Sequence, residues 1–333
     1  KWESKRTFNV GLDALLFEEK LSVTLDYYRS KTVDLLYEYD VPTPPFIHPK
    51  LLANMGEMEN NGLEISFRYT PLKTKDMEFS FSPNFSWQEN KLVALGGTYN
   101  GQEITPSKYW RLGGISGAGL IGGNTTATYN FVGKPIGSFY LPKSNGLIDN
   151  GFGDYSYNVV SLDDDPEVNI NDGYDRYIAG QAIPKFYLGT NLNFRYKSFD
   201  IQTQLNGAFG HKIYNGTSLT YMNMNTFPTY NVLEGAPERN IRDNAVTDFW
   251  LEDGDYLNIE YISVGYNINT SKFNKYVKTM RLTASVNNVY TFTKYSGLSP
   301  MINTSVMNDN LGIDDKRFYP LSRTFSIGLS VNF

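Results

Sequence analysis

Residues 324–333 read Thr-Phe-Ser-Ile-Gly-Leu-Ser-Val-Asn-Phe, a stretch in which polar and apolar side chains alternate without a break. Successive side chains of a β-strand point to opposite faces, so this alternation predicts a strand with one apolar and one polar face. The apolar face carries Phe325, Ile327, Leu329, Val331 and the terminal Phe333.

The same period of two recurs along the chain and predicts about nine strands. They cover residues 5–16, 21–36, 63–70, 77–88, 186–196, 199–214, 254–268, 278–294 and 324–333. Most are longer than the roughly 5 or 6 residues usual in sheets and suit a tilted membrane-spanning strand of roughly 9–11 residues. The apolar face switches near Tyr261, and Pro83 removes a backbone donor, so we expect a β-bulge at each place.

Charged residues on the polar faces decide what surrounds the strands. These residues are Asp26, Glu64, Arg68, Glu78 and Arg195. Placing these charged side chains against lipid would cost free energy, whereas a water-filled lumen solvates them. The sequence therefore predicts an all-β protein, an antiparallel transmembrane β-barrel.

The connections between the predicted strands alternate in length. Residues 17–20, 70–76, 197–200 and 269–279 are short, whereas 37–56, 92–183, 215–253 and 295–321 are long and rich in Gly, Asn, Pro and Tyr. Short periplasmic turns and long extracellular loops are typical of outer-membrane barrels. A loop as long as 92–183 is usually functional, so we expect it to bind a ligand or a partner.

An odd number of strands has a topological consequence. Single-chain bacterial barrels have an even number of strands, with both termini on the periplasmic side. If the last of nine strands runs inward to Phe333, the first also runs inward and starts on the outer side. We therefore expect residues 1–333 to be the C-terminal portion of a larger barrel.

Composition excludes several other classes of protein. There are no cysteines, and the two histidines, His48 and His211, are far apart, so a disulfide scaffold, thiol catalysis and most zinc sites are excluded. With a net charge of −5 and no basic block, the chain has no expected nucleic-acid surface. The carboxylate pairs Glu57/Glu59 and Asp253/Asp255 do not by themselves indicate a glycosidase, and we expect no enzyme.

Several stretches, in this order and spacing, resemble the C-terminal half of the barrel of SusC-like TonB-dependent outer-membrane transporters. They are FNVGLD at 8–13, DYYRSKTVDLL at 26–36, NNGLE at 60–64, GKPIGSFY at 133–140, YKSFD at 196–200, WLEDGDYL at 250–257 and NNVYTFTKY at 287–295. The resemblance covers nearly the whole chain.

The resemblance implies a 22-stranded barrel whose plug domain and earlier strands lie upstream, and contact with TonB through that missing part. It also implies a SusD-like lipoprotein as an extracellular lid, and import of oligosaccharides or, in some relatives, peptides. By the same resemblance the chain is a multi-pass protein of the outer membrane, in contact with its lipid, and Phe333 with its strand serves barrel assembly.

Aromatic residues in the long loops are the candidates for contact with substrate or lid. They are Tyr109, Trp110, Tyr155, Tyr157, Tyr174 and Trp250, in a chain with 15% aromatic residues. Amphipathic rings can stack on sugar faces or pack against a partner protein. The alternative for each residue is packing within its own loop.

Two further motifs have a simpler explanation. Residues 117–122 match the Gly-x-Gly-x-x-Gly pattern of dinucleotide-binding sites. No predicted strand and helix flank them, so we expect them to form an outer loop. A cluster of oxygen-bearing side chains in the same long loop could bind calcium. However, Val168 and Ile170 occupy positions at which an EF-hand has ligands, so a solvated loop is favoured. The cluster comprises Asp163, Asp164, Asp165, Asn169, Asn171 and Asp172. No metal site or other cofactor is expected.

One alternative to the transporter stays open from the sequence. A secreted all-β module that binds glycans through aromatic loops would also show alternating strands. Such a module would point its apolar faces into a core of its own.

Overall fold

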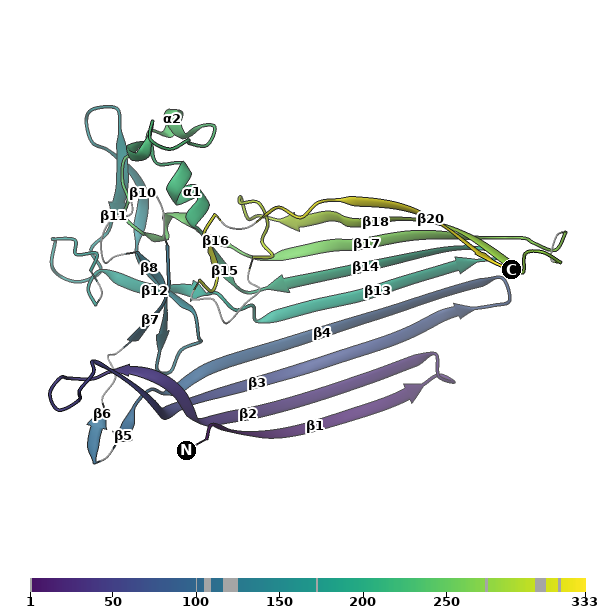
Figure 1. Ribbon diagram of the computed structural model, residues 1–333, viewed down its shortest axis with the longest axis horizontal. Coiled ribbons are helices and arrows are strands. Elements are labelled where there is room, and N and C mark those ends of the chain that lie inside the picture. The colour runs from purple at the N-terminus through teal and green to yellow at the C-terminus, as the bar shows by residue number, and fades with distance from the viewer. Residues whose placement is uncertain are drawn as a thin grey trace.

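The computed structural model describes residues 2–99, 101–104, 109–115, 125–171, 173–272, 275–302, 310–316 and 319–333. Its main feature is one open antiparallel sheet of nine long strands, which lie side by side in Figure 1. In spatial order these are β1 (Ser4–Leu16), β2 (Leu21–Asp40), β3 (Lys50–Lys73), β4 (Met77–Ala94), β13 (Phe186–Tyr196), β14 (Phe199–Phe209), β17 (Tyr256–Ile268), β18 (Thr279–Thr293) and β20 (Thr324–Asn332). The predicted all-β fold with nine antiparallel strands is confirmed.

The register of the strands separates the two faces of the sheet as predicted. Asp26 pairs with Glu64 across β2 and β3, and Glu78 pairs with Arg195 across β4 and β13. Arg68 lies on the same face as these four residues, which is polar along all of the central strands. The opposite face is lined by apolar pairs such as those of β18 with β20.

Among the described residues no other element covers the apolar face, as Ile327 illustrates with 84% of its surface exposed. Phe8, Leu12, Phe325 and Leu329 are exposed in the same way on β1 and β20. A secreted module would have to bury this face in a core, whereas lipid can cover it. This arrangement counts against the secreted glycan-binding module. Among the described residues, no helix is long and apolar enough to span a membrane.

The irregular positions differ in part from the prediction. The expected bulge near Tyr261 is confirmed: the register of β17 shifts between Ile259 and Tyr261. The bulge expected at Pro83 is wrong, because β4 and β13 keep one register through the Pro83–Thr190 pair. The β3–β4 register shifts instead between Tyr69 and Leu72. Pro83 is accommodated because a missing N–H donor interrupts a ladder without changing its register.

Short turns and long connections lie at opposite ends of the sheet, as predicted (Figure 1). Two of the boundaries were wrong. β2 continues to Asp40 and β3 begins at Lys50, so most of the expected loop 37–56 is a hairpin that extends the sheet. The backbone pairing of the two strands continues to the Asp40–Lys50 pair, with register shifts between Thr32 and Leu36. The strand predicted over 199–214 ends at Phe209, and Lys212–Asn215 forms a separate strand in another sheet.

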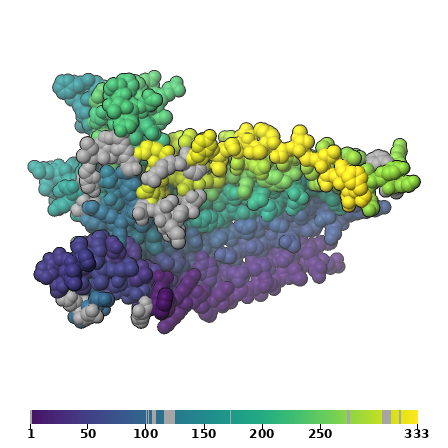
Figure 2. Space-filling view, viewed as in Figure 1, coloured from purple at the N-terminus to yellow at the C-terminus, as the bar shows by residue number. Residues whose placement is uncertain are grey.

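The remaining connections fold into small sheets and helices beyond the outer ends of the strands. Residues 95–185 contain β5 (Gly97–Tyr99), β6 (Gln102–Ile104), β7 (Tyr109–Gly114), β8 (Thr126–Phe131), β9 (Ser138–Pro142), β10 (Ser144–Asp149), β11 (Tyr155–Val159) and β12 (Arg176–Gln181). Residues 210–255 contain β15 (Lys212–Asn215), α1 (Gly216–Tyr221), η1 (Met224–Thr226), α2 (Ala236–Arg239), η2 (Asp248–Trp250) and β16 (Leu251–Asp253), and β19 (Ile313–Asp314) follows β18. We call these segments together the loop body. Figure 2 shows them gathered at one end of the elongated molecule.

Candidate functional site

The loop body has a hydrophobic core of its own, built from three connections that are far apart in sequence. Its buried members are Ile115, Ala127, Phe139, Leu141, Tyr157, Ala182, Tyr214, Leu219, Ile241, Val246, Trp250, Leu311 and Ile313. Burying a large apolar side chain contributes about 1.5–3 kcal/mol. The long connections are therefore packed against one another, and they present a fixed surface at the outer end of the barrel wall.

Tyr157 and Trp250 belong to this core. They are 5% and 7% exposed, and Trp250 donates a hydrogen bond from Nε1 to Tyr157 Oη at 2.7 Å. Burial raises the pKa of the Tyr157 hydroxyl. Both rings are enclosed by the loop body, so we assign them to packing in this structure.

Tyr109 lies in an aromatic cluster with Tyr129, Phe131 and Tyr140, with ring centroids 5.5 to 6.0 Å from its own. Arg176 closes this cluster. Its guanidinium lies 5.6 Å from the Tyr129 ring centre and donates to Tyr129 Oη at 2.5 Å and to the Ile170 carbonyl at 3.1 Å. A buried cation over aromatic faces is stabilising when it is hydrogen-bonded in this way. Neither Arg176 nor its partners carried a signal in the sequence that would have identified the cluster.

The other predicted aromatic residues lie apart from one another. Trp110 is half-buried, edge-on to Tyr37 and Tyr39 at the outer end of β2. Tyr155 is half-buried in β11, where its backbone pairs with Asn240. Tyr174 is 59% exposed on the loop before β12. Of the six residues, Tyr174 is the most accessible, and contact with a substrate or a lid stays a prediction for it.

The oxygen-rich segment is organised around Asp175. This carboxylate is buried and accepts hydrogen bonds from the backbone N–H of Leu162 at 2.6 Å and of Asn169 at 2.7 Å. Those hydrogen bonds hold the pKa of Asp175 below its usual range. Asp163 and Asp165 each accept from a backbone N–H two residues on, as in ordinary turns.

Within the ranges that the structure describes, no group of three or more acidic or histidine side chains is close enough to hold a metal ion. Asp172 of the expected ligands lies outside the described residues, as do the glycines of 117–122. Asp164 is exposed on its turn.

The carboxylate pair Glu57/Glu59 has structural partners. Glu57 and Glu59 pair with Lys31 and Arg29 across the strands, at 2.7 and 3.4 Å. His48 is exposed in the outer hairpin.

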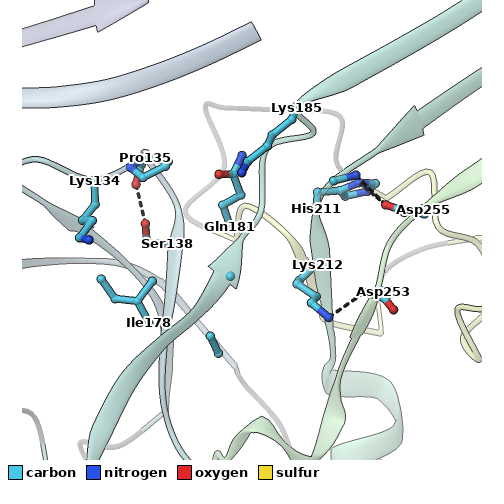
Figure 3. Close-up of a pocket in the computed structure, with 13 residues that line it drawn as sticks. Lys134, Pro135, Ser138, Ile178, Gln181, Lys185, His211, Lys212, Asp253 and Asp255 are labelled. Carbon is cyan, nitrogen blue, oxygen red and sulfur yellow. Dashed lines mark hydrogen bonds and ion pairs between the residues drawn. The ribbon is translucent and has the colours of Figure 1, made fainter. Parts of the chain in front are cut away.

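A cavity of about 490 Å³ lies where the loop body meets the outer ends of β13, β14 and β17 (Figure 3). Lys134, Lys185 and Lys212 line it together with His211 and two carboxylates, Asp253 and Asp255. Lys212 Nζ lies 2.6 Å from Asp253 Oδ1, which holds the pKa of that carboxyl below its usual range. This cavity was not predicted from the sequence, because its lining comes from four separate segments.

Comparison with known proteins was made over the whole chain. No protein-family model matches it. TonB-dependent receptor P3 of Formosa agariphila is 31% identical, and the alignment covers 100% of this chain and 34% of that receptor. TonB-dependent receptor SusC of Bacteroides thetaiotaomicron is 26% identical, over 100% of this chain and 32% of its own length. The chain thus spans about a third of the relatives it matches.

Among solved structures, that of the RagAB peptide transporter aligns over 100% of this chain and 36% of its own, with a TM-score of 0.75 and 20% identity. Fold and sequence therefore agree over the same extent. Over its whole length the chain matches TonB-dependent receptors of the SusC type. The predicted resemblance and the predicted outer-membrane location are confirmed.

Membership in the TonB-dependent receptors also bears on chemistry. These relatives are receptors rather than enzymes, in agreement with the expectation that the chain carries no catalytic site.

Proposed function

We propose that residues 1–333 form the C-terminal portion of the barrel of a TonB-dependent importer, which carries oligosaccharides or peptides across the outer membrane. The earlier strands and a plug domain would precede this portion, and TonB would act on that part. The observation that carries the proposal is the open nine-stranded sheet, with one face apolar and uncovered and the other charged. In a closed barrel the charged face would line the path of the substrate.

The odd number of strands supports an incomplete wall. Among the described residues, the edge strands β1 and β20 each pair with one neighbour only. Exposed edges of this length are hazards unless other strands cover them. Additional strands of the same receptor would pair with both edges. As β20 would then close the barrel, its aromatic end at Phe333 would assist insertion.

We further propose a lid lipoprotein of the SusD type as the extracellular partner. The packed loop body supports this, because a fixed surface binds a partner without the entropy cost of ordering loops. Tyr174 and the outer hairpin between Asp40 and Lys50 are among the exposed parts available for such a contact. The RagAB transporter carries peptides, and the resemblance of the sequence implies oligosaccharides or peptides, so both substrate classes are carried forward.

The experiment is performed on the whole receptor in its native membrane. Its gene is deleted, and growth is measured on peptides or on oligosaccharides as the only carbon source, with and without the complementing gene. We expect growth on one of the two classes to be lost and to return only with a receptor whose TonB contact is intact. Equal growth of the deletion strain on both classes would refute import, and a receptor that purifies without any lipoprotein would refute the lid.

A further inference from the structure

The apolar face of the sheet becomes basic toward the outer ends of β1 and β2, which lie at one edge of the sheet (Figure 1). Going outward on this face, the successive pairs are Leu12 with Leu25, Val10 with Tyr27, Phe8 with Arg29, and Arg6 with Lys31. Side chains two residues apart on a strand share a face. The three basic residues therefore continue the surface on which Phe8 and Val10 are 62% and 55% exposed.

Two of these three cations already have acidic partners. Lys31 Nζ lies 2.7 Å from Glu57 Oε2, and Arg29 Nη2 lies 3.4 Å from Glu59 Oε2. Arg6 is exposed, and among the described residues it has no carboxylate within ion-pair distance. Three basic and two acidic side chains thus leave one positive charge uncompensated at this position.

The neighbours of Arg6 on β2 are themselves cations. Lys31 lies directly opposite Arg6 in the register, and Arg29 lies diagonally, one pair further inward on the same face. Like charges opposite each other on antiparallel strands destabilise the pairing. An anion bound between Arg6 and these two side chains would offset that repulsion, so the arrangement favours a bound anion.

The position of the three cations on the strands indicates what kind of anion this is. Aromatic rings at the end of an apolar face mark the interface between membrane and water. Tyr27 is the last apolar residue of β2 on this face, and Arg29 follows two residues, or about 7 Å, further along the strand. On β4 the ring of Trp87 ends the apolar run in the same way and is followed on that face by Glu89 and Lys91. The charged residues therefore begin where lipid headgroups lie.

We propose that Arg6, with Arg29 and Lys31 beside it, binds a phosphate of a glycolipid in the outer leaflet of the outer membrane. A phosphate monoester carries nearly two negative charges and three acceptor oxygens, to which guanidinium groups donate paired hydrogen bonds. The acyl chains of the same molecule would cover Phe8 and Val10, immediately inward of the phosphate. A soluble phosphate compound would leave these two apolar side chains uncovered, so the surface favours a lipid. The inference depends on the outer-membrane location and not on which substrate the receptor imports.

The test uses the whole receptor in a nonionic detergent, with diphosphoryl lipid A as the probe. Binding is titrated by native mass spectrometry for the unmodified receptor and for Arg6→Gln. A basic residue near an anionic lipid surface accounts for about a fivefold change in affinity, so we expect binding to weaken about fivefold. Arg6→Lys keeps the charge and should lose less. Unchanged binding in Arg6→Gln would refute the site.

The matched control is Lys5→Gln. It removes the same charge from the exposed neighbouring residue, which lies on the polar face opposite Thr32. Its lipid A binding should equal that of the unmodified receptor, and a loss equal to that of Arg6→Gln would mean a general charge effect and no site. Lipid A without phosphate groups should bind the unmodified receptor more weakly, and equal binding would contradict phosphate recognition. Displacement of lipid A by inorganic phosphate alone would contradict a lipid ligand.

A second measurement separates loss of the phosphate contact from damage to the strands. Without lipid A, Arg6→Gln should unfold at the same urea concentration as the unmodified receptor or at a higher one, because the substitution removes a repulsion between like charges. Unfolding at a clearly lower urea concentration would show that Arg6 stabilises the strands by itself and would overturn its assignment to a bound phosphate.

Discussion

The guanidinium of Arg281 on β18 reaches across β17 to the carboxylate of Asp200 on β14, with nitrogen–oxygen distances of 2.7 and 2.8 Å. Gly265 lies opposite Asp200 in the register of β17, and a Cβ at this position would overlap the guanidinium. The missing side chain lets two strands that are not neighbours share an ion pair. Arg195 lies 3.4 Å from Glu78 and pairs in register with Asp200, so alternating charges cross the polar face from β4 to β18.

Substitution Gly265→Ala should therefore destabilise the sheet through the ion pair. The added methyl group must displace the guanidinium, and overpacking of this kind costs about 1–3 kcal/mol. Urea-induced unfolding of the whole receptor in lipid vesicles measures this free energy. In the background Arg281→Met the same substitution should cost much less, because the guanidinium is gone. An equal cost in both backgrounds would mean that Gly265 acts through the backbone and not through Arg281.

Removal of the hydroxyl in Tyr157→Phe should loosen the loop body. Trp250 Nε1 would then lose its acceptor while staying buried, and an unsatisfied buried donor costs about 1–3 kcal/mol. Hydrogen exchange of the amides in β11 and η2 reports the opening free energy of this region. Tyr174→Phe is the matched control, since that ring is mostly exposed and exchange should not change. Unchanged protection in Tyr157→Phe would show that water replaces the lost acceptor.

The contrast between the strands and the loop body shows what this sequence reveals directly. Alternation identified all nine long strands, because a strand with lipid on one side and water on the other must repeat every two residues. The polar face was also predictable, since charged residues such as Arg195 and Glu78 alternate with the apolar residues of their strands. The core of the loop body was not, because Ile115, Trp250 and Leu311 have no common period and meet only in three dimensions.

The aromatic candidates show the same limit. In the sequence nothing distinguishes Trp250, which is buried, from Tyr174, which is exposed, because each is an aromatic residue in a long loop. Arg176 and Asp175, which organise two parts of the loop body, are adjacent in sequence and carry no spacing motif. Their partners, such as Tyr129 and Leu162, come from other turns, so only the folded chain brings out their roles.

The replacement Arg176→Lys should destabilise the loop body although it keeps the charge. The planar guanidinium donates to Tyr129 Oη and to the Ile170 carbonyl while it covers two rings, which an ammonium group cannot do at once. We expect a loss of about 2 kcal/mol in the opening free energy of β8 and β12, read from hydrogen exchange. Arg242→Lys is the control, because Arg242 is partly exposed and its ion-pair distance is 3.9 Å. A loss confined to Arg242→Lys would contradict this assignment.

The acidic segment should respond to pH through Asp175. The N–H groups of Asn169 and Leu162 lower the pKa of Asp175 in the folded state. The stabilising effect of the carboxylate is therefore fully present above the ordinary carboxyl pKa of about 3.9. It is lost as the pH falls through the lower pKa of the folded state. Protection of those two amides, measured by hydrogen exchange and corrected for the intrinsic rate at each pH, should hold through mildly acidic pH and fall only in strong acid. In Asp175→Asn protection should be low at neutral pH and nearly independent of pH, because one acceptor is replaced by a donor. Asp149→Asn, at an exposed turn that caps Gly151, should leave the profile unchanged. Wild-type protection in Asp175→Asn at neutral pH would show that the segment holds its shape without this carboxylate.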